Sequence, residues 1–441
     1  MIPCNQHESR LSAVKSATAA LSAIFFIGWL CGPAGAGEKQ PTATKPALPA
    51  TPPTLTGDWG GWRTKFADHG LTLQVYMTGF LQAQAGGSGA SAWINDLTER
   101  GTGPGPYFGG RMDALFELNS QKMGLWPGGS LHGHAELELG ELPGWSGGAL
   151  WPVNSAAITP LVDQGQLTLS SLFYRQRLWD TTITVGKINA LDLLARDPFF
   201  GGWGIERFQN LAFVASPNGI TQLVMVGGSI DQKIGDFNFT ALLFDPNNRG
   251  TDSLDNLFSD GVNFSFSAQW NGKLWDRPSN LGISYNFSTR ELVDLEELYL
   301  PSDLRLSSPK MPDSLVVRFG HQFWTSPVRP GKGIGFYGRV GATQGNPNPI
   351  QWSLACGITG EGMWQSRPWD GFGIGVYHYE WSNGLSTALL TPVGPETGLE
   401  VYYTCAVTPW FVVTPDLQVI APSTEGSPVF TVLGLRALIR F

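Results

Sequence analysis

Long apolar runs are missing from this sequence after its first 36 residues. A membrane-spanning helix needs about 20 mostly apolar residues, and no later segment approaches that length. Charge is also scarce, since Asp, Glu, Lys and Arg make up 15% of the chain, against about 25% in soluble domains. The first absence excludes a bundle of membrane helices, and the second argues against an ordinary soluble domain.

Other absences narrow the function further. The chain has no GxxxxGK[ST] sequence, so nothing indicates a nucleotide-driven process. The formal net charge of -8 argues against nucleic-acid binding. Four cysteines are too few for disulfides to stabilise the fold of a chain of this length. No pattern points to a cofactor.

The N-terminus has the three-part layout of a secretory signal. Arg10 and Lys15 precede an apolar run from Ala19 to Leu30, and Ala34-Gly35-Ala36 forms an A-x-A cleavage site. Residues 37–56 are rich in Pro, Ala and Thr and have no apolar periodicity, which predicts a flexible segment. We therefore expect residues 1–36 to be removed near Ala36, and one folded domain to span residues 57–441.

Period-2 alternation recurs along that domain. In the clearest case one face is apolar and the other ionisable: Leu131, Gly133, Ala135, Leu137 and Leu139 alternate with His132, His134, Glu136 and Glu138. A soluble sandwich turns the apolar face inward, whereas a membrane barrel turns it outward and lines a watery lumen with the polar face. Periodicity alone leaves both readings open.

The spacing of strand-like segments favours the barrel. We predict sixteen strands, at 71–83, 110–120, 130–140, 167–178, 181–190, 220–231, 235–245, 260–271, 281–289, 315–325, 334–344, 352–365, 371–382, 397–407, 411–420 and 429–441. Their connections mostly alternate long and short, as in an outer-membrane barrel with short periplasmic turns and long outer loops. The predicted fold class is an all-β, transmembrane, antiparallel β-barrel.

The final segment supports the same fold. Residues Leu433, Leu435, Ala437, Ile439 and Phe441 share one face, and the chain ends on this aromatic. Such an ending is the usual recognition signal for the outer-membrane insertion machinery. We expect this strand to pair with the first one, near 71–81, and to close the barrel.

The two cysteines after the signal lie on non-adjacent predicted strands. Cys356 shares a face with Leu354 and Ile358, and Cys405 lies with Val401 and Tyr403. Both are expected to face lipid. A disulfide is not expected, because bridged cysteines need Cα atoms within about 7 Å.

Several blocks, in order and at similar spacing, resemble the carbohydrate-selective porin family of the porin B type. They are Leu55–Thr64 with Gly70, Trp126–Ser130, Val185–Lys187, Phe208–Phe213, Arg367–Asp370 with Gly373 and Gly375, Glu400 with Tyr403, Pro409-Trp410, and Pro415–Gln418 before Pro422. The resemblance implies a sixteen-stranded barrel that lets sugars diffuse through the outer membrane of a Gram-negative bacterium, with loops folded into the lumen. It also implies either a monomer or a homotrimer.

The sequence departs from the family pattern at Arg175 and Gln269, where a carboxylate is expected. Exchanging a carboxylate for a guanidinium replaces acceptors with donors and reverses the local charge. These departures bear on the preferred solute rather than on the family.

A selective sugar passage needs hydrogen-bonding groups and an aromatic face. The segment Asp197–Phe213 is unusually aromatic, and we interpret it as a constriction loop dipping into the barrel; the alternative is a loop that packs its aromatics over the mouth. The pore-lining and substrate-contact candidates are Arg111, Asp113, Glu117, His132, His134, Glu136, Glu138, Arg175, Lys187, Trp203, Glu206, Arg207, Arg318, Gln322, Arg339, Glu361, Glu400, Arg436 and Arg440.

Three other functions stay open. The many predicted lumenal arginines would also suit a general porin or one for anions and organic acids. The paired carboxylates Glu136 and Glu138 could belong to a glycoside hydrolase carried on the barrel. Residues two positions apart on a strand are separated by about 7 Å, which is within the range of carboxylate separations in inverting glycosidases. His132, His134 and Glu136 share a face and could chelate a metal. We expect neither catalysis nor a metal, because such residues are commonplace on a polar lumen wall.

Overall fold

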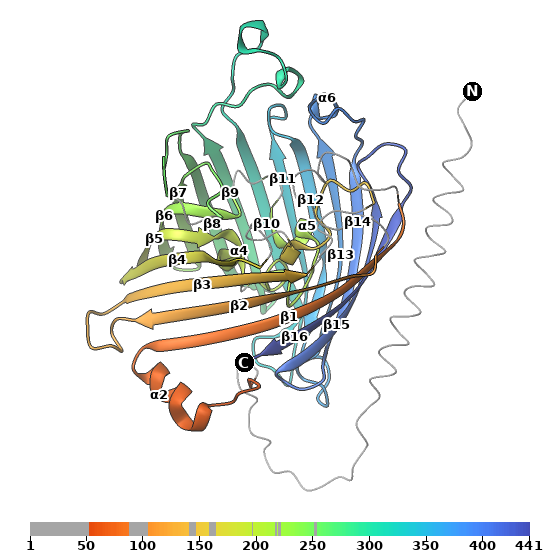
Figure 1. The fold of residues 1–441 in the computed structure, drawn as a ribbon. Coiled ribbons are helices and arrows are strands. Elements are labelled where there is room, and N and C mark those ends of the chain that lie inside the picture. Colours follow the sequence, from red (N-terminus) through yellow and green to blue (C-terminus); the bar gives the residue numbers. More distant parts are fainter. Residues whose placement is uncertain are drawn as a thin grey trace.

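The chain folds into a closed antiparallel barrel in which each strand pairs with its neighbours in sequence (Figure 1). This computed structural model describes residues 53–87, 105–140, 147–157, 165–195, 197–216, 218, 222–250 and 254–441. The expected signal peptide and nearly all of the Pro-rich segment lie outside the described residues. Both fold-level predictions, sixteen strands and all-antiparallel pairing, are confirmed.

The strands are β1 (Leu71–Gly86), β2 (Tyr107–Asn119), β3 (Gly129–Gly140), β4 (Leu167–Leu178), β5 (Thr181–Asn189), β6 (Val224–Ile234), β7 (Phe237–Phe244), β8 (Asn263–Leu274), β9 (Arg277–Ser288), β10 (Asp313–Thr325), β11 (Gly333–Thr343), β12 (Ile350–Glu361), β13 (Gly371–Trp381), β14 (Glu396–Ala406), β15 (Phe411–Ala421) and β16 (Phe430–Arg440). The α-helices are α2 (Trp62–Asp68), α4 (Ala190–Leu194), α5 (Leu211–Val214) and α6 (Leu385–Ala388), and the 3-10 helices are η1 (Trp59–Gly61), η2 (Ser155–Ala157), η3 (Leu295–Glu297) and η4 (Ser302–Leu304). None of the helices in the described part of the chain has the length and apolar character to cross a membrane.

The last strand closes the barrel as expected. β1 and β16 pair antiparallel with Met77 opposite Ile439, and the backbone N–H of Phe441 donates to the carbonyl of Val75 at 2.9 Å. The N-terminal segment lies at the same rim, where the N–H of Leu55 donates to the carbonyl of Arg440 at 2.7 Å. We call this rim, which also holds the connections β4–β5 and β8–β9, the short-turn end.

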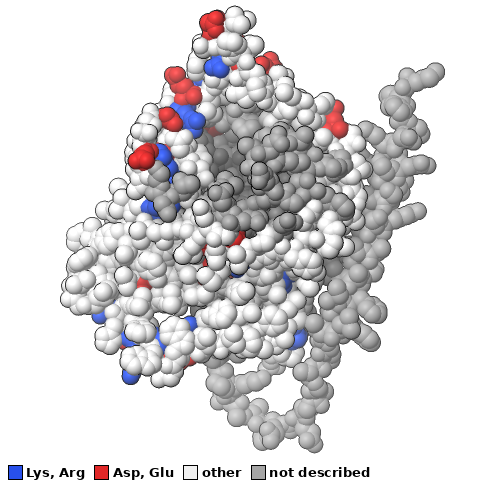
Figure 2. Space-filling view, in the orientation of Figure 1, with Lys and Arg blue, Asp and Glu red and all other residues white. Residues whose placement is uncertain are grey.

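The outer surface of the barrel wall is apolar. Ile183, Val185, Ile230 and Leu281 are all exposed there, and most of the wall visible in Figure 2 carries no charge. Alternate residues therefore point toward an apolar surrounding, as lipid provides. Trp179 and Trp275 stand at the short-turn end, 90% and 84% exposed, where interfacial aromatics are usual.

The cysteines agree with one expectation and differ from the other. Neither Cys356 nor Cys405 forms a disulfide. Cys405 is buried rather than open to lipid, because the guanidinium of Arg367 reaches its Sγ at 3.0 Å. Arg367 is held there by Asp370, which also accepts a hydrogen bond from the hydroxyl of Tyr403 at 2.5 Å. The turn between β12 and β13 thus covers the thiol.

Candidate functional site

A long segment between β5 and β6 occupies the inside of the barrel. We call its described residues, 190–195, 197–216, 218, 222 and 223, the inner loop; α4 and α5 belong to it, and Figure 1 shows both within the ring of strands. Each of its helices begins at an asparagine whose side chain accepts the N–H two residues on, Asn189 for α4 and Asn210 for α5. These side chains satisfy helix N–H groups that would otherwise lack acceptors.

Glu400 of β14 fixes the centre of the inner loop. Its carboxylate accepts the backbone N–H groups of Gln209 and Asn210 at 2.5 and 2.9 Å. The side chain of Asn210 in turn donates to Gln418 of β15 at 3.1 Å. Because one carboxyl group accepts two adjacent backbone N–H groups, this contact positions the loop backbone.

Two buried arginines hold the loop carbonyls. Arg436 of β16, 0% exposed, donates to the carbonyls of Gly204 and Arg207, both at 2.8 Å. Arg339 of β11 donates to the carbonyls of Ala212 and Ala215 at 2.8 and 2.5 Å. An arginine can satisfy two carbonyls at once because its donors are fixed in a planar fork.

The aromatic side chains of the loop pack against the barrel wall. Phe199, Phe200, Phe208 and Phe213 form a buried cluster with inward-facing tyrosines of β13 and β14. The rings of Phe208 and Phe213 lie 4.4 Å apart, centroid to centroid. The loop therefore dips into the barrel as predicted, but these four rings form a dry core rather than an aromatic lining.

A second anchor joins the loop to β2 and β3. His134 lies between Asp113 and Asp192, with ring nitrogens 3.0 and 2.9 Å from their carboxylates. Asp192 belongs to α4 and also accepts the indole N–H of Trp203 at 2.8 Å. Burial alone would raise the pKa of Asp192. The charge of His134, together with the hydrogen bonds that Asp192 accepts from His134 and Ser171, holds that pKa below its usual value.

All of these contacts lie on one contiguous arc of the barrel. We call β11–β16 together with β1–β4 the anchored wall, because its inward side chains hold the inner loop. We call the inward face of β7–β10 the open wall. Its inward polar side chains include Asn238, Thr240, Ser267, Gln269, Asn280, Ser284, Arg318 and Gln322. Their hydrogen bonds in the described chain stay within the wall or reach β6, as from Thr240 to Asp231.

Beneath the inner loop lies a cavity of about 620 Å³ at the short-turn end. It is bounded by the start of β1, the ends of β12 and β16, the N-terminal helix α2 and loop residues Trp203, Glu206 and Arg207. Tyr76 and Trp203 present aromatic rings to it, with centroids 6.2 Å apart. We call this space the short-turn cavity.

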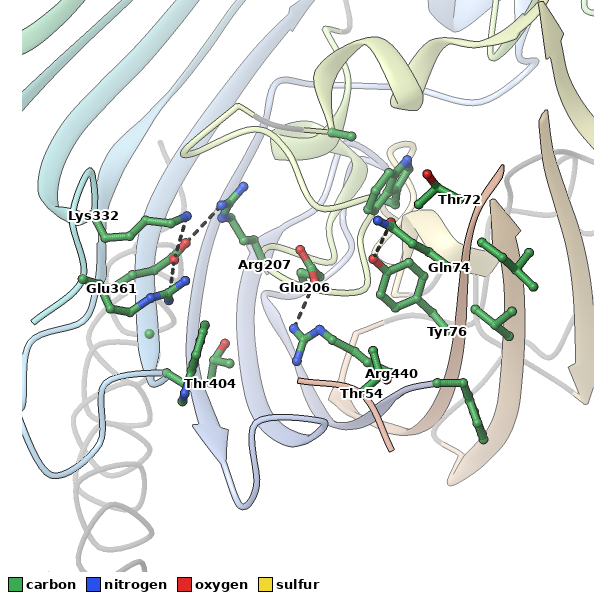
Figure 3. A pocket seen from close by; sticks show the side chains of 18 of the residues that line it. Thr54, Thr72, Gln74, Tyr76, Glu206, Arg207, Lys332, Glu361, Thr404 and Arg440 are labelled. Carbon is green, nitrogen blue, oxygen red and sulfur yellow. Dashed lines mark hydrogen bonds and ion pairs between the residues drawn. The ribbon is translucent and has the colours of Figure 1, made fainter. Parts of the chain in front are cut away.

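Ion pairs cross the short-turn cavity (Figure 3). Glu361 receives Arg207, Lys332 and Arg329 at 3.0, 2.9 and 3.3 Å, while Arg440 pairs with Glu206 at 3.0 Å. Glu361 offsets the effect of burial and raises the pKa of Arg207. Burial, together with neighbouring cations, lowers the pKa of Arg329. One carboxylate is thus shared among three cations.

All but one of the predicted residues on the strands lie on the inward face. Those within buried networks are Arg111, Asp113, His134, Glu136, Glu138, Arg339, Glu400 and Arg436. Those that are partly accessible or line the short-turn cavity are Glu117, His132, Arg175, Trp203, Glu206, Arg207, Arg318, Glu361 and Arg440. Gln322 belongs to the open wall but is buried, at 8% exposed.

Lys187 is the exception, and its predicted inward orientation is wrong. It pairs with Leu172 and Val226 and shares the face of the exposed Ile183 and Val185, which is the outer surface. Its Nζ lies 3.5 Å from the carbonyl of Gly250 in the loop after β7. The residue before it, Gly186, faces inward beside Phe173 instead.

Sequence reasoning missed several residues of the site. Asp192, Arg329, Lys332 and Tyr76 did not appear among the candidates, although each takes part in an anchor or lines the short-turn cavity. Asp192, Arg329 and Lys332 lie outside the strands, where alternation gives no signal. Tyr76 lies on β1 but is not charged, and charge guided the selection.

The hydrolase and metal alternatives gain no support from this geometry. Glu136 and Glu138 are buried, and Glu136 is engaged by Arg111 at 3.1 Å and by the hydroxyl of Ser170 at 2.6 Å. Asp113, His134 and Glu136 could in principle surround a cation. Arg111 already lies 2.6 Å from Asp113, so a guanidinium supplies the positive charge there. His132 is not part of this group and stacks on Phe173.

Comparisons with known proteins agree with the geometry. A sequence model of the carbohydrate-selective porin, OprB family, matches residues 72–441. A high-pH structure of Pseudomonas putida OprB is similar with a TM-score of 0.73 at 18% identity, covering 90% of this chain and 100% of that one. A low-pH structure of Pseudomonas putida OprB gives 0.50 at 16% identity, covering 89% and 100%. No curated protein matches the sequence. Because the family match spans the whole barrel, the chain belongs to the OprB family of carbohydrate-selective porins, channels of the Gram-negative outer membrane.

Proposed function

We propose that mono- and small oligosaccharides diffuse passively through this porin between the inner loop and the open wall. The observation that carries the proposal is the one-sided attachment of the loop. Glu400, Arg436 and Arg339 bind its backbone from the anchored wall, while the hydrogen bonds of the open-wall side chains Asn238, Thr240, Gln269, Arg318 and Gln322 stay within that wall or reach β6. The loop therefore narrows the lumen from one side and leaves a polar passage along the other.

The open wall suits a neutral sugar. Sugar hydroxyls both donate and accept, and amides and hydroxyls such as those of Asn238, Thr240 and Gln269 do the same. Arg318 adds a donor fork that already bonds to Gln269. Such a surface exchanges hydrogen bonds with a passing solute without presenting a strong field of one sign.

The short-turn cavity continues the path toward the exit. Tyr76 and Trp203 offer rings against which the C–H face of a sugar can lie. The ion pairs Arg207–Glu361 and Arg440–Glu206 place donors and acceptors beside those rings. We assign the contact role to these residues and to Arg318 and Gln322, and a loop-holding role to the buried residues.

Conduction also requires weak binding, because a tightly held solute leaves slowly. Millimolar affinity corresponds to about -4 kcal/mol. A sugar that replaces several hydrogen bonds to water with hydrogen bonds to the protein, and that makes one aromatic contact, gains a binding free energy of that order. Flux should follow the concentration gradient.

The setting of the channel is part of the proposal. Removal of residues 1–36 would deliver the chain to the periplasm, and the last strand, ending at Phe441, would address it to the insertion machinery and then face outer-membrane lipid. The short-turn end would face the periplasm, as in other outer-membrane barrels. Either a monomer or a homotrimer fits the family resemblance, and native mass spectrometry in detergent distinguishes them.

A reconstitution experiment tests the proposed function. Full-length processed protein in planar bilayers should show an ion current that glucose and maltose reduce reversibly, in the millimolar range. Proteoliposomes should swell in these sugars without any energy source. Currents that ignore both sugars but discriminate strongly between ions would favour the general or organic-acid porin instead.

A further inference from the structure

We propose that the short-turn cavity is a binding site for the anionic group of an acidic monosaccharide, a sugar carboxylate or sugar phosphate. The inference rests on the proposed function, because it concerns solutes that travel the same path. It adds a class of solute that the neutral open wall alone would not favour.

The charge balance of the cavity is the first argument. Five cationic side chains border it, while its side-chain carboxylates are those of Glu206 and Glu361. The cations are Arg63, Arg207, Arg329, Lys332 and Arg440. The surplus is concentrated at Glu361, which forms ion pairs with three of these cations, Arg207, Arg329 and Lys332. A second anion there would relieve the repulsion among these three.

The accessibility of these groups is the second argument. The side chains of Lys332 and Glu361 are 36% and 27% exposed, whereas those of Arg207 and Arg329 are 12% and 10% exposed. Lys332 can therefore swing toward a solute while the two arginines stay in place. Arg329 is further fixed by stacking over the ring of Trp369, 4.2 Å from its centroid.

Shape and chemistry point to a sugar rather than a bare anion. The cavity volume of about 620 Å³ lies within the range of about 300–1,000 Å³ usual for small-molecule sites, far more than a small ion needs. Tyr76 stands on the side opposite Lys332 and Glu361 (Figure 3), and the ring of Trp203 lies next to that of Tyr76, with centroids 6.2 Å apart. A sugar ring stacked there could extend its anionic group toward the cations. Gln74 supplies a further acceptor and lies 3.1 Å from the hydroxyl of Tyr76.

The test measures block of the ion current in bilayers containing the full processed chain. Glucuronate, glucose 6-phosphate, glucose and acetate are titrated at about 0.1 M salt, where the Debye length is about 10 Å. We expect the anionic sugars to bind several-fold more tightly than glucose, and acetate to bind weakly because it has no ring to stack. At 1 M salt the advantage of the anionic sugars should shrink.

Variants that are expected to change glucuronate binding in opposite directions sharpen the test. Lys332→Gln should weaken glucuronate binding about 1.4- to 5-fold, the effect of losing one exposed charge pair. Lys332→Arg should retain it, and Glu361→Gln should strengthen it. Lys273→Gln is the matched control, because Lys273 is exposed at the same end of the barrel but does not border the cavity. Migration of unheated protein on a gel reports whether each variant is folded.

The outcomes separate the two proposals. If glucose and maltose fail to enter proteoliposomes, the proposed function is wrong. If they enter but glucuronate and glucose 6-phosphate bind no more tightly than glucose, or acetate blocks as well as they do, the anionic-sugar site is overturned. Equal effects of Lys332→Gln and Lys273→Gln would also overturn it. A preference for the phosphate over the carboxylate, or the reverse, supports the site and identifies the source of the anion.

Discussion

The two walls of this barrel are built from similar strands, but the side chains that they direct into the barrel differ. The anchored wall directs charged and aromatic side chains inward and buries them against the inner loop, as Glu400 and Arg436 do. The open wall directs amides and hydroxyls inward and leaves Thr240, Ser267 and Gln269 partly accessible. The same period-2 alternation thus builds a core on one side and a passage on the other.

The comparison distinguishes charged residues that hold the inner loop in place from charged residues that can contact a solute. Buried charged groups on the anchored wall are hydrogen-bonded, as Arg436 and Arg339 are to loop carbonyls, and some are also ion-paired, because an uncompensated buried charge would be very costly. Arg111 with Asp113 and Glu136 is one such group. A charged lumen residue is therefore more often a loop anchor here than a solute contact.

The largest expected effect comes from removing a loop anchor. Arg436→Met leaves the carbonyls of Gly204 and Arg207 without their donors. At about 1–3 kcal/mol for each unsatisfied buried group, the free energy of unfolding should fall by about 2–6 kcal/mol. Urea unfolding in detergent measures this loss, and single-channel conductance should rise because the loop is loosened. An unchanged conductance would show that Arg436 does not hold the constriction.

The same large residue placed on each wall should have different consequences. Ala355→Trp inserts a bulky ring into the aromatic cluster of the anchored wall, where Ala355 is 2% exposed, and should destabilise by at least about 1–3 kcal/mol. Ser267→Trp faces the open wall and should fold normally while reducing glucose flux. Urea midpoints and liposome swelling compare the pair. Similar destabilisation by both would remove the distinction between the walls.

A charge change on the open wall should alter selectivity but not stability. Arg318→Gln removes a cation of β10 whose described hydrogen bond goes to Gln269 on β8, two strands away in the open wall. We expect a change in unfolding free energy within about 0.5 kcal/mol, as for other accessible positions. The reversal potential in a salt gradient should shift toward cations. Destabilisation by several kcal/mol would instead identify Arg318 as an anchor.

The smallest effect concerns pH. The pKa of Asp192 is lower in the folded barrel than in the unfolded chain, so its stabilising contribution is complete above the unfolded value of about 4 and is lost as the pH falls through the lower folded value. Asp192→Asn should therefore reduce the acid sensitivity of the unfolding midpoint below about pH 5. If the wild-type and variant midpoints keep parallel pH profiles, Asp192 is not the responsible group.

Much of the fold could be predicted from local pattern. Alternation gives strands such as β4 at 167–178, and the terminal apolar face gives the pairing of β16 with β1. Lys187 was misplaced because charge was taken to define the inward face, whereas Ile183 and Val185 set the outer face of β5. Ile188, two residues after Gly186, faces inward because the interior near α4 is itself a dry core.

The partners of the inner loop were beyond prediction for a physical reason. Gln209 and Glu400 are 191 residues apart, and Arg207 and Glu361 are 154 apart. Such contacts depend on the closed barrel, which brings distant strands around one loop. The aromatic content of Asp197–Phe213 indicated a loop inside the barrel, but not that its rings would face the anchored wall.

Thiol modification tests the central claim most directly. In protein carrying Cys356→Ser and Cys405→Ser, a bulky sulfonated thiol reagent is added while single channels are recorded from Ser267→Cys and, for comparison, Ala355→Cys. The account predicts a stepwise fall in current and loss of glucose block for Ser267→Cys, with Ala355→Cys unreactive. Equal reaction and equal block at both positions, or no block at Ser267→Cys, would contradict a passage along the open wall.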